Sequence, residues 1–242
     1  MNLISNAPAT AEKKVLEQIA YQTALYFPLD HKELSNCNDL QSILNRSKEI
    51  LQNEIEEGKT EDLFVDPEYI EGLEAIIGED GSYPELGEAM IGNKSWTKES
   101  GEFDSQGFLA CTFTLPKGNG EINVCFRGTP DGAWIDNGYG MAGGEYLIPY
   151  ENTQQGVTNL GVSPMQHNAL EYMQSIIDKN EGKTINISGH SKGGNETQLA
   201  ALVFADKINA AYNFDGQGFP PDVVEQLQNL PDWEEGLTCN LL

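Results

Sequence analysis

Basic side chains are scarce in this sequence. Its 242 residues contain 14 Lys and Arg against 38 Asp and Glu, which gives a formal net charge of −24 at pH 7. A chain with this charge repels phosphate backbones, so nucleic acid is excluded as a partner that binds by charge. A strongly anionic substrate is disfavoured for the same reason, unless a local basic group or a metal ion receives it.

Long apolar runs and paired cysteines are also missing. No apolar stretch reaches the roughly 18 residues of a transmembrane helix, and the polar start of the chain lacks the apolar core of a Sec signal peptide. The cysteines form no CxxC motif, which argues against a zinc knuckle; they are Cys37, Cys111, Cys125 and Cys239. Isolated cysteines without a secretion signal predict a cytoplasmic protein, or one exported without a Sec signal.

Residues 1–105 predict helices. Apolar residues at helical spacing begin after Thr10, recur at about 39–57 behind a capping Asp39, and recur again at about 67–77. Acidic residues outnumber basic ones throughout this part of the chain. We expect residues 1–105 to form an acidic helical cap or lid region.

Residues 106–242 alternate between strand and helix signals. Strands are expected at 108–115, 122–126, 184–188, 210–214 and 237–242, and helices at about 163–179, 196–205 and 221–228. A glycine-rich, irregular segment is expected at about 128–161. This alternation predicts an α/β core with a mostly parallel sheet.

One motif in this core carries chemistry. Residues 189–193 fit G-x-S-x-G between an expected strand and an expected helix, which predicts a nucleophile elbow with Ser191 on a tight turn. Gly189 and Gly193 avoid clashes on either side of the serine. The backbone N–H of Lys192 is the expected donor to a developing oxyanion. The alternative is a chance turn, because three fixed positions are a weak pattern alone.

A second motif lies upstream, where an expected strand ends at Arg127 and Gly128 permits a sharp turn before Thr129. In elbow enzymes the other oxyanion donor comes from an earlier strand–loop junction, so Thr129 is the candidate for that role. The alternative is an ordinary strand exit, with Arg127 as a surface ion-pair partner.

These segments resemble a known family. FRGT at 126–129, GHSKGGN at 189–195 and NFDGQGF at 213–219 look like the Mbeg-like family of α/β hydrolases, which is related to class 3 lipases. In that wider group, the FRGT-type segment builds the oxyanion hole and the GHSxGG segment holds the nucleophile. The resemblance covers about residues 106–242 and implies an α/β-hydrolase core that hydrolyses acyl esters, as a lipase or phospholipase does.

The acid of a catalytic triad has one good candidate in this chain. Asp215 follows an expected strand, at the carboxyl end where α/β sheets place their sites. The alternative makes residues 213–219 a loop that shapes the binding site. In class 3 lipases the acid comes one strand later, and by that comparison the acid would lie beyond Leu242.

The histidine base is harder to assign. Elbow enzymes carry it after the acid, but His31, His167 and His190 all precede Ser191. A structural role is favoured for His190, and the other two are weak candidates for the base. We therefore expect the hydrolase core to be incomplete at its C-terminus, with a second polypeptide as a possible source of the missing histidine.

The glycine-rich segment offers other side chains. Its carboxylates lack the spacing of a calcium loop and predict a solvated loop with no metal site; they are Asp131, Asp136 and Glu145. Its aromatic residues suit an acyl-binding wall or lid, or simply pack on the core; they are Trp134, Tyr139, Tyr146 and Tyr150. No residue pattern indicates a cofactor.

The sequence leaves several function classes open. The first is a serine-dependent hydrolase of an uncharged or lipid-like ester, which suits a surface of net charge −24. The second is a non-catalytic, hydrolase-like module for binding or regulation, which the missing histidine favours. The third is a serine peptidase built on the same elbow.

Overall fold

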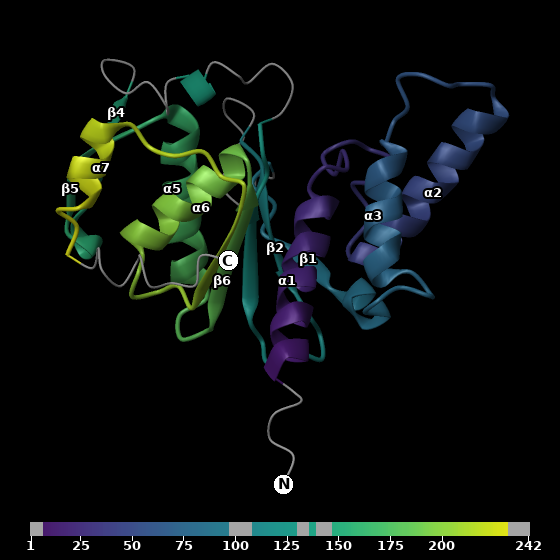
Figure 1. Cartoon of the computed structure of the whole chain (residues 1–242), viewed down its shortest axis with the longest axis horizontal. Helices are drawn as coiled ribbons and strands as arrows, with labels where there is room; N and C mark the ends of the chain where they lie inside the picture. The colour runs from purple at the N-terminus through teal and green to yellow at the C-terminus, as the bar shows by residue number, and fades with distance from the viewer. Residues whose placement is uncertain (1–6, 97–107, 130–135, 139–146, 232–242) are drawn as a thin grey trace, which may run out of the picture. The chain divides into compact units, whose positions relative to one another are not determined.

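The computed structural model describes residues 7–96, 108–129, 136–138 and 147–231, with the side chains of 7–10 left out. The chain divides into two compact units (Figure 1). The first unit comprises residues 1–92 and 113–119, and the second comprises residues 93–112 and 120–242. The description of residues 1–105 as a cap or lid stays a prediction.

The first unit holds the three helices expected near the N-terminus. They are α1 (Ala7–Ala24), α2 (Leu40–Glu56) and α3 (Pro67–Ile77), followed by the 3-10 helix η1 (Pro84–Glu88) and the short strand β1 (Met90–Gly92). Asp39 caps α2 as expected, because its Oδ1 accepts a 2.7 Å hydrogen bond from the Ser42 N–H. The apolar spacing and this cap therefore predicted α2 and α3 correctly, whereas α1 begins at Ala7, before the expected start after Thr10.

Helix α1 buries a face that the apolar spacing does not indicate. Glu17 and Gln18 are buried, whereas Val15 is only half-buried. The Tyr21 hydroxyl donates a 3.0 Å hydrogen bond to Glu17 Oε1, and the Tyr21 ring stacks on Phe113 at a centroid distance of 4.5 Å. Hydrogen bonding thus lets this helix bury Glu17, which a hydropathy pattern assigns to solvent.

The second unit is built on a mostly parallel sheet, as expected. Its neighbouring strands run in the order β2 (Ala110–Thr114), β3 (Ile122–Phe126), β6 (Ile185–His190) and β7 (Ala210–Phe214). Strand β6 pairs in parallel with both β3 and β7. Because β6 and β7 end side by side at His190 and Phe214, the residues that follow both strands meet at one edge of the sheet.

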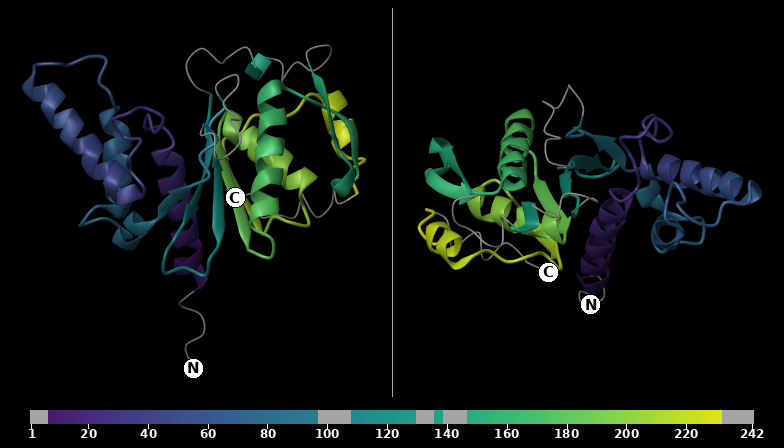
Figure 2. Two further views of the ribbon diagram at one scale, coloured as in Figure 1. Left: turned by 180° about the vertical axis from the view of Figure 1, so that it is seen from behind. Right: turned by 90° about the horizontal axis from the view of Figure 1, so that it is seen from above.

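Helices pack around this sheet. They are α5 (Pro164–Lys179), α6 (Lys192–Val203) and α7 (Pro221–Leu227). Helix α6 packs against β6 and β7, and Figure 2 shows α5 beside α6. Helix α6 begins at Lys192, earlier than expected, because two glycines in its first turn weaken the helical signal of the sequence.

A β-hairpin replaces part of the segment expected to be irregular. Strand β4 (Ile148–Asn152) pairs antiparallel with β5 (Val157–Val162), and the 3-10 helix η5 (Thr153–Gln155) joins them. Pro149 within β4 and Asn159 within β5, which has a φ of 56°, both count against a strand in sequence analysis. The expectation of irregular structure was therefore wrong at 148–162.

The core of the second unit contains an aromatic cluster. The rings of Phe108, Phe126 and Tyr172 lie with centroids 6.0–6.5 Å apart, and all three side chains are fully buried. Within the described residues, no helix combines the length and the apolar character needed to cross a membrane. The strand expected at 237–242 lies outside the described residues.

Candidate active site

Ser191 occupies a strained turn between β6 and α6. Its φ of 55° and ψ of −118° lie in a region that residues other than glycine rarely adopt. The turn is held from two sides, because the Ser191 N–H donates to the Phe214 carbonyl at 3.0 Å and its own carbonyl accepts from the Asn195 N–H at 3.1 Å. The side chain is half-buried at the first turn of α6, where backbone N–H groups are free of helical partners.

The glycines around Ser191 are required by space. A Cβ atom built on Gly189 would lie 2.0 Å from the Gly193 carbonyl oxygen. A Cβ atom on Gly193 would lie 2.2 Å from the Phe126 carbonyl oxygen, at the end of β3. Both contacts are far shorter than van der Waals distance and both involve backbone. The two glycines therefore allow α6 to start directly against the strand ends.

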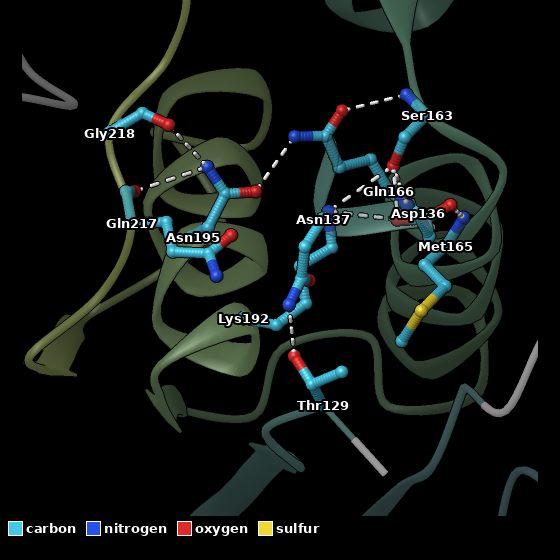
Figure 3. Close-up of polar contacts among 10 residues, drawn as sticks. All are labelled: Thr129, Asp136, Asn137, Ser163, Met165, Gln166, Lys192, Asn195, Gln217 and Gly218. Atoms are coloured by element: carbon cyan, nitrogen blue, oxygen red, sulfur yellow. Dashed lines mark hydrogen bonds and ion pairs between the residues drawn. The ribbon is translucent and has the colours of Figure 1, made fainter. Parts of the chain in front are cut away.

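Thr129 lies just beyond β3 and is held by a residue that sequence reasoning missed. The side-chain amide of Asn137 donates a 2.6 Å hydrogen bond to Thr129 Oγ1 (Figure 3). Asn137 is buried in the helical stretch 136–138. An asparagine eight residues after the threonine gives no recognisable motif, so this partner could be found only in the structure.

The Lys192 side chain is fully buried and pairs with Asp136. Its Nζ lies 2.9 Å from Asp136 Oδ2, and it also lies 3.3 Å from Ser163 Oγ. Asp136 further accepts hydrogen bonds from Ser163 Oγ at 2.8 Å and from the Met165 N–H at 3.0 Å. The expectation of a solvated loop was therefore wrong for Asp136, because burial of Lys192 requires a nearby counter-charge.

Glu196 lies one helical turn after Lys192 and is also fully buried. Neither of its carboxyl oxygens has a hydrogen-bond partner among the described residues. Burial raises the pKa of the Glu196 carboxyl well above 4.5; nearby Lys192 opposes the shift and Asp136 adds to it. Burial therefore disfavours the charged form of Glu196, whereas Asp136 contacts the lysine ammonium directly at 2.9 Å.

Asp215 lies in the loop that follows β7. It is exposed and has a φ of 52°, which an aspartate tolerates better than most residues. The Gly216 N–H donates to Asn213 Oδ1 at 2.9 Å, and the Gln217 N–H lies 3.4 Å from the Ser191 carbonyl oxygen. The structure therefore brings the loop of Asp215 beside the turn of Ser191.

Asn195 fastens the same loop to the helices. Its side-chain amide donates to the carbonyls of Gln217 and Gly218, both at 3.2 Å (Figure 3). Its Oδ1 accepts a 2.7 Å hydrogen bond from the buried Gln166 of α5. Sequence reasoning missed this bridge between α5, α6 and the loop, because the three segments are far apart along the chain.

The structure places the three histidines in separate surroundings. His190 is the exposed last residue of β6, directly before Ser191. The His167 ring lies edge-on to Tyr150 at a centroid distance of 5.6 Å. In the first unit, the His31 ring contacts Phe64 edge-on at 4.8 Å.

Only some of the aromatic and acidic side chains of the glycine-rich segment lie within the described residues. Tyr150 is buried in β4, and burial raises the pKa of its hydroxyl. The other three aromatic residues, and the carboxylates Asp131 and Glu145, lie outside the described residues. Across the described ranges, no group of three or more His, Cys, Asp or Glu side chains is arranged to hold a metal ion.

A family model agrees with the expected resemblance over part of the chain. Residues 158–230, which include Ser191, Lys192 and Asp215, match the Mbeg1-like family model. No curated protein matches the sequence. Among solved structures, the crystal structure of M37 lipase is similar at 16% sequence identity and a TM-score of 0.46; the alignment covers 90% of this chain and 64% of that chain. Over residues 158–230 this chain is therefore similar to the Mbeg1-like family, as its motifs had indicated.

Proposed function

We propose that the second unit is the core of a serine-dependent hydrolase of acyl esters, similar to a lipase or phospholipase. The observation that carries this proposal is the strained backbone of Ser191, with φ 55° and ψ −118°, between a parallel strand and a helix. A nucleophile elbow needs this turn to lift the hydroxyl above the sheet edge. An uncharged or lipid-like ester suits the net charge of −24.

The reaction begins at the Ser191 hydroxyl. Its Oγ bonds to the ester carbonyl carbon while its proton passes to a base, and the carbonyl oxygen becomes an oxyanion. Collapse of this intermediate breaks the bond to the alcohol, which leaves with a proton. Water then attacks the acyl-serine in the same way, releasing the carboxylic acid and restoring Ser191.

Two donors are proposed to hold the oxyanion. One is the backbone N–H of Lys192, which lies at the start of α6 where the helix dipole favours negative charge. The other is Thr129, through its N–H and its hydroxyl. Asn137 supports the second donor, because its 2.6 Å hydrogen bond occupies an acceptor lone pair of Thr129 Oγ1 and leaves the O–H to donate.

Asp215 is proposed as the acid that orients the histidine base. The support is its position after β7, in a loop whose Gln217 N–H reaches toward the Ser191 carbonyl at 3.4 Å. Asp215→Asn should lower kcat by roughly 10³- to 10⁴-fold, as loss of the orienting charge does in other triads. An unchanged kcat would exclude Asp215 as the catalytic acid.

A fluorophosphonate probe tests the proposal directly. The complete protein should become labelled at Ser191, and Ser191→Ala should abolish the labelling. Ser175→Ala is the matched control, because Ser175 is a half-buried serine of the same unit whose hydroxyl bonds the Tyr172 carbonyl. Labelling that survives in Ser191→Ala, or a folded wild type that never reacts, would overturn the hydrolase proposal.

The base can be identified with the same probe. Alanine variants of His31, His167 and His190 should each be labelled at the wild-type rate unless that histidine is the base. If all three variants react normally, the histidine base lies outside residues 1–242. Vesicles, short-chain esters and peptides compared as substrates then separate a lipase-like hydrolase from a peptidase.

A non-catalytic binding module is the second candidate. The specific observation that favours it is the surroundings of two histidines, since His167 packs on Tyr150 and His31 packs on Phe64. A folded protein that the fluorophosphonate never labels, yet that binds lipid vesicles, would support this function.

A further inference from the structure

The proposed function uses the backbone N–H of Lys192 but gives no role to its buried side chain. The residue follows Ser191 directly, and its side chain is fully buried with Nζ 2.9 Å from Asp136 Oδ2. Burying an ion pair stabilises a fold little and often less than an apolar pair would. An apolar side chain at position 192 would therefore serve folding at least as well, so stability alone does not account for a lysine here.

Asp136 links this ion pair to the segment that carries Thr129. Its neighbour Asn137 donates the 2.6 Å hydrogen bond to Thr129 Oγ1. Asp136 itself is anchored by Ser163 Oγ at 2.8 Å and by the Met165 N–H at 3.0 Å, both at the first turn of α5. Figure 3 shows the resulting chain of contacts from Lys192 through residues 136–137 to Thr129.

We infer that Lys192 is a positioning residue of the proposed hydrolysis, whose ammonium group acts through Asp136 to set Thr129 at a fixed place relative to the Lys192 N–H. The inference rests on the proposed function and deepens it. One residue would then supply one oxyanion donor from its backbone and hold the other through its side chain. The two donors lie on segments more than 60 residues apart in sequence. A direct link between these segments would therefore help to keep the two donors aligned on the oxyanion.

The charge environment suits this role. The ammonium has Asp136 and Ser163 as partners, and both are buried, so the pair is shielded from water and salt. Glu196 is the other buried acid beside the lysine, and neither of its oxygens has a partner in the described part of the chain. Burial raises the pKa of the Glu196 carboxyl and so disfavours its charged form, and Asp136 is the acid that contacts the ammonium, at 2.9 Å.

The test replaces the ion pair by a neutral pair. Lys192→Met combined with Asp136→Asn removes both charges, leaves no unpaired buried charge, and keeps the backbone N–H of residue 192. If Lys192 only stabilises the fold, the folded double variant should keep its kcat. If it positions Thr129, kcat with a soluble ester should fall by about 10- to 100-fold while KM changes little, because the loss is confined to the transition state.

A matched control separates positioning from general destabilisation. Asn186→Ala disturbs another buried polar group of the second unit, which bonds Asn123 and Asn209 in the sheet. It should lower the melting temperature and leave kcat unchanged. A double variant that also has a lower melting temperature but an unchanged kcat per folded molecule, as expected of Asn186→Ala, overturns the inference.

Coupling to Thr129 is the decisive readout. In a Thr129→Val background, where the hydroxyl donor is absent, the neutral pair should lower kcat by less than about threefold, since its effect passes through that hydroxyl. Equal losses in both backgrounds would overturn the positioning role while leaving the hydrolase proposal intact. Failure of the wild type to react with a fluorophosphonate would instead overturn the hydrolase proposal.

A readout without activity completes the test. The side-chain NH₂ signals of Asn137 should be protected from exchange in the wild type, because this group is buried and bonded to Thr129. The neutral-pair variant should lose that protection. Unchanged protection would show that residues 136–137 keep their place without the lysine, and would overturn the inference whether or not the protein is an enzyme.

Discussion

The side-chain amide of Asn137 donates a 2.6 Å hydrogen bond to the hydroxyl oxygen of Thr129, just beyond the end of β3. This bond occupies one lone pair of the hydroxyl oxygen and so restricts the directions in which the Thr129 O–H can donate. It also joins Thr129, which the sequence motif indicated, to Asn137, which no sequence motif indicated. The orientation of the Thr129 hydroxyl therefore depends on its contact with Asn137.

Loss of the Thr129 hydroxyl should impair the proposed oxyanion site. Thr129→Val keeps the shape of the side chain and should lower kcat by roughly 10²- to 10³-fold, the usual effect of removing one oxyanion donor. Thr129→Ser keeps the hydroxyl and serves as the control, with kcat close to wild type. Steady-state hydrolysis of a soluble ester measures both. Equal activity of the two variants would show that the Thr129 hydroxyl does not stabilise the oxyanion.

The strained turn at Ser191 should cost the protein stability. Ser191→Gly relieves a φ of 55° with ψ of −118° and should raise the free energy of unfolding by about 1–2 kcal/mol, while abolishing fluorophosphonate labelling. Ser191→Ala also removes the hydroxyl but keeps the strain, so it is the control and should leave stability nearly unchanged. Urea unfolding of both variants checks the difference. A glycine variant no more stable than the alanine variant contradicts the prediction.

Gly193 should not tolerate a larger side chain. In Gly193→Ala the new Cβ would lie 2.2 Å from the Phe126 carbonyl oxygen, so backbone has to move, at a cost of about 1–3 kcal/mol or more. Gly218→Ala is the control in the same unit, because nothing lies within 4 Å of its Cβ position. Thermal unfolding should show a lower melting temperature for the first variant only. Similar melting temperatures would argue against the close approach of α6 to β3.

Glu196 should make stability depend on pH. Burial raises the pKa of its carboxyl in the folded state above 4.5, so the folded protein binds this proton more tightly than the unfolded chain does. The stability that the protonated Glu196 carboxyl contributes is fully present below about pH 4.5, and it is lost as pH rises through the pKa of the folded state. Glu196→Gln cannot ionise, so its stability relative to wild type should increase as pH rises.

Urea unfolding at several pH values between about 4 and 8 measures this difference. Glu181→Gln is the control, because Glu181 is an exposed acid of the same unit. Its stability relative to wild type should stay nearly constant over the range. A Glu196→Gln variant that behaves like this control would indicate that the Glu196 carboxyl has found a partner and ionises normally.

Much of the secondary structure could be predicted from sequence. Strands β3 and β7 and helix α3 occupy the ranges that apolar patterning indicates, and α5 matches the helix expected at about 163–179. The hairpin β4–β5 could not be predicted, because Pro149 and a left-handed Asn159 interrupt the signals on which strand prediction relies. These local exceptions are stabilised by pairing between the two strands.

The sequence by itself determined the α/β character of residues 106–242, the place of Ser191 between a strand and a helix, and the two segments proposed to stabilise an oxyanion. These features follow from local patterns, since apolar spacing, caps and glycines act within a few residues of one another. Only the tertiary structure decided that Lys192 is buried on Asp136, that Asn137 binds Thr129, and that Asn195 holds the loop of Asp215. Such contacts join segments distant along the chain, and a buried charge or amide finds its partner only once packing has excluded water.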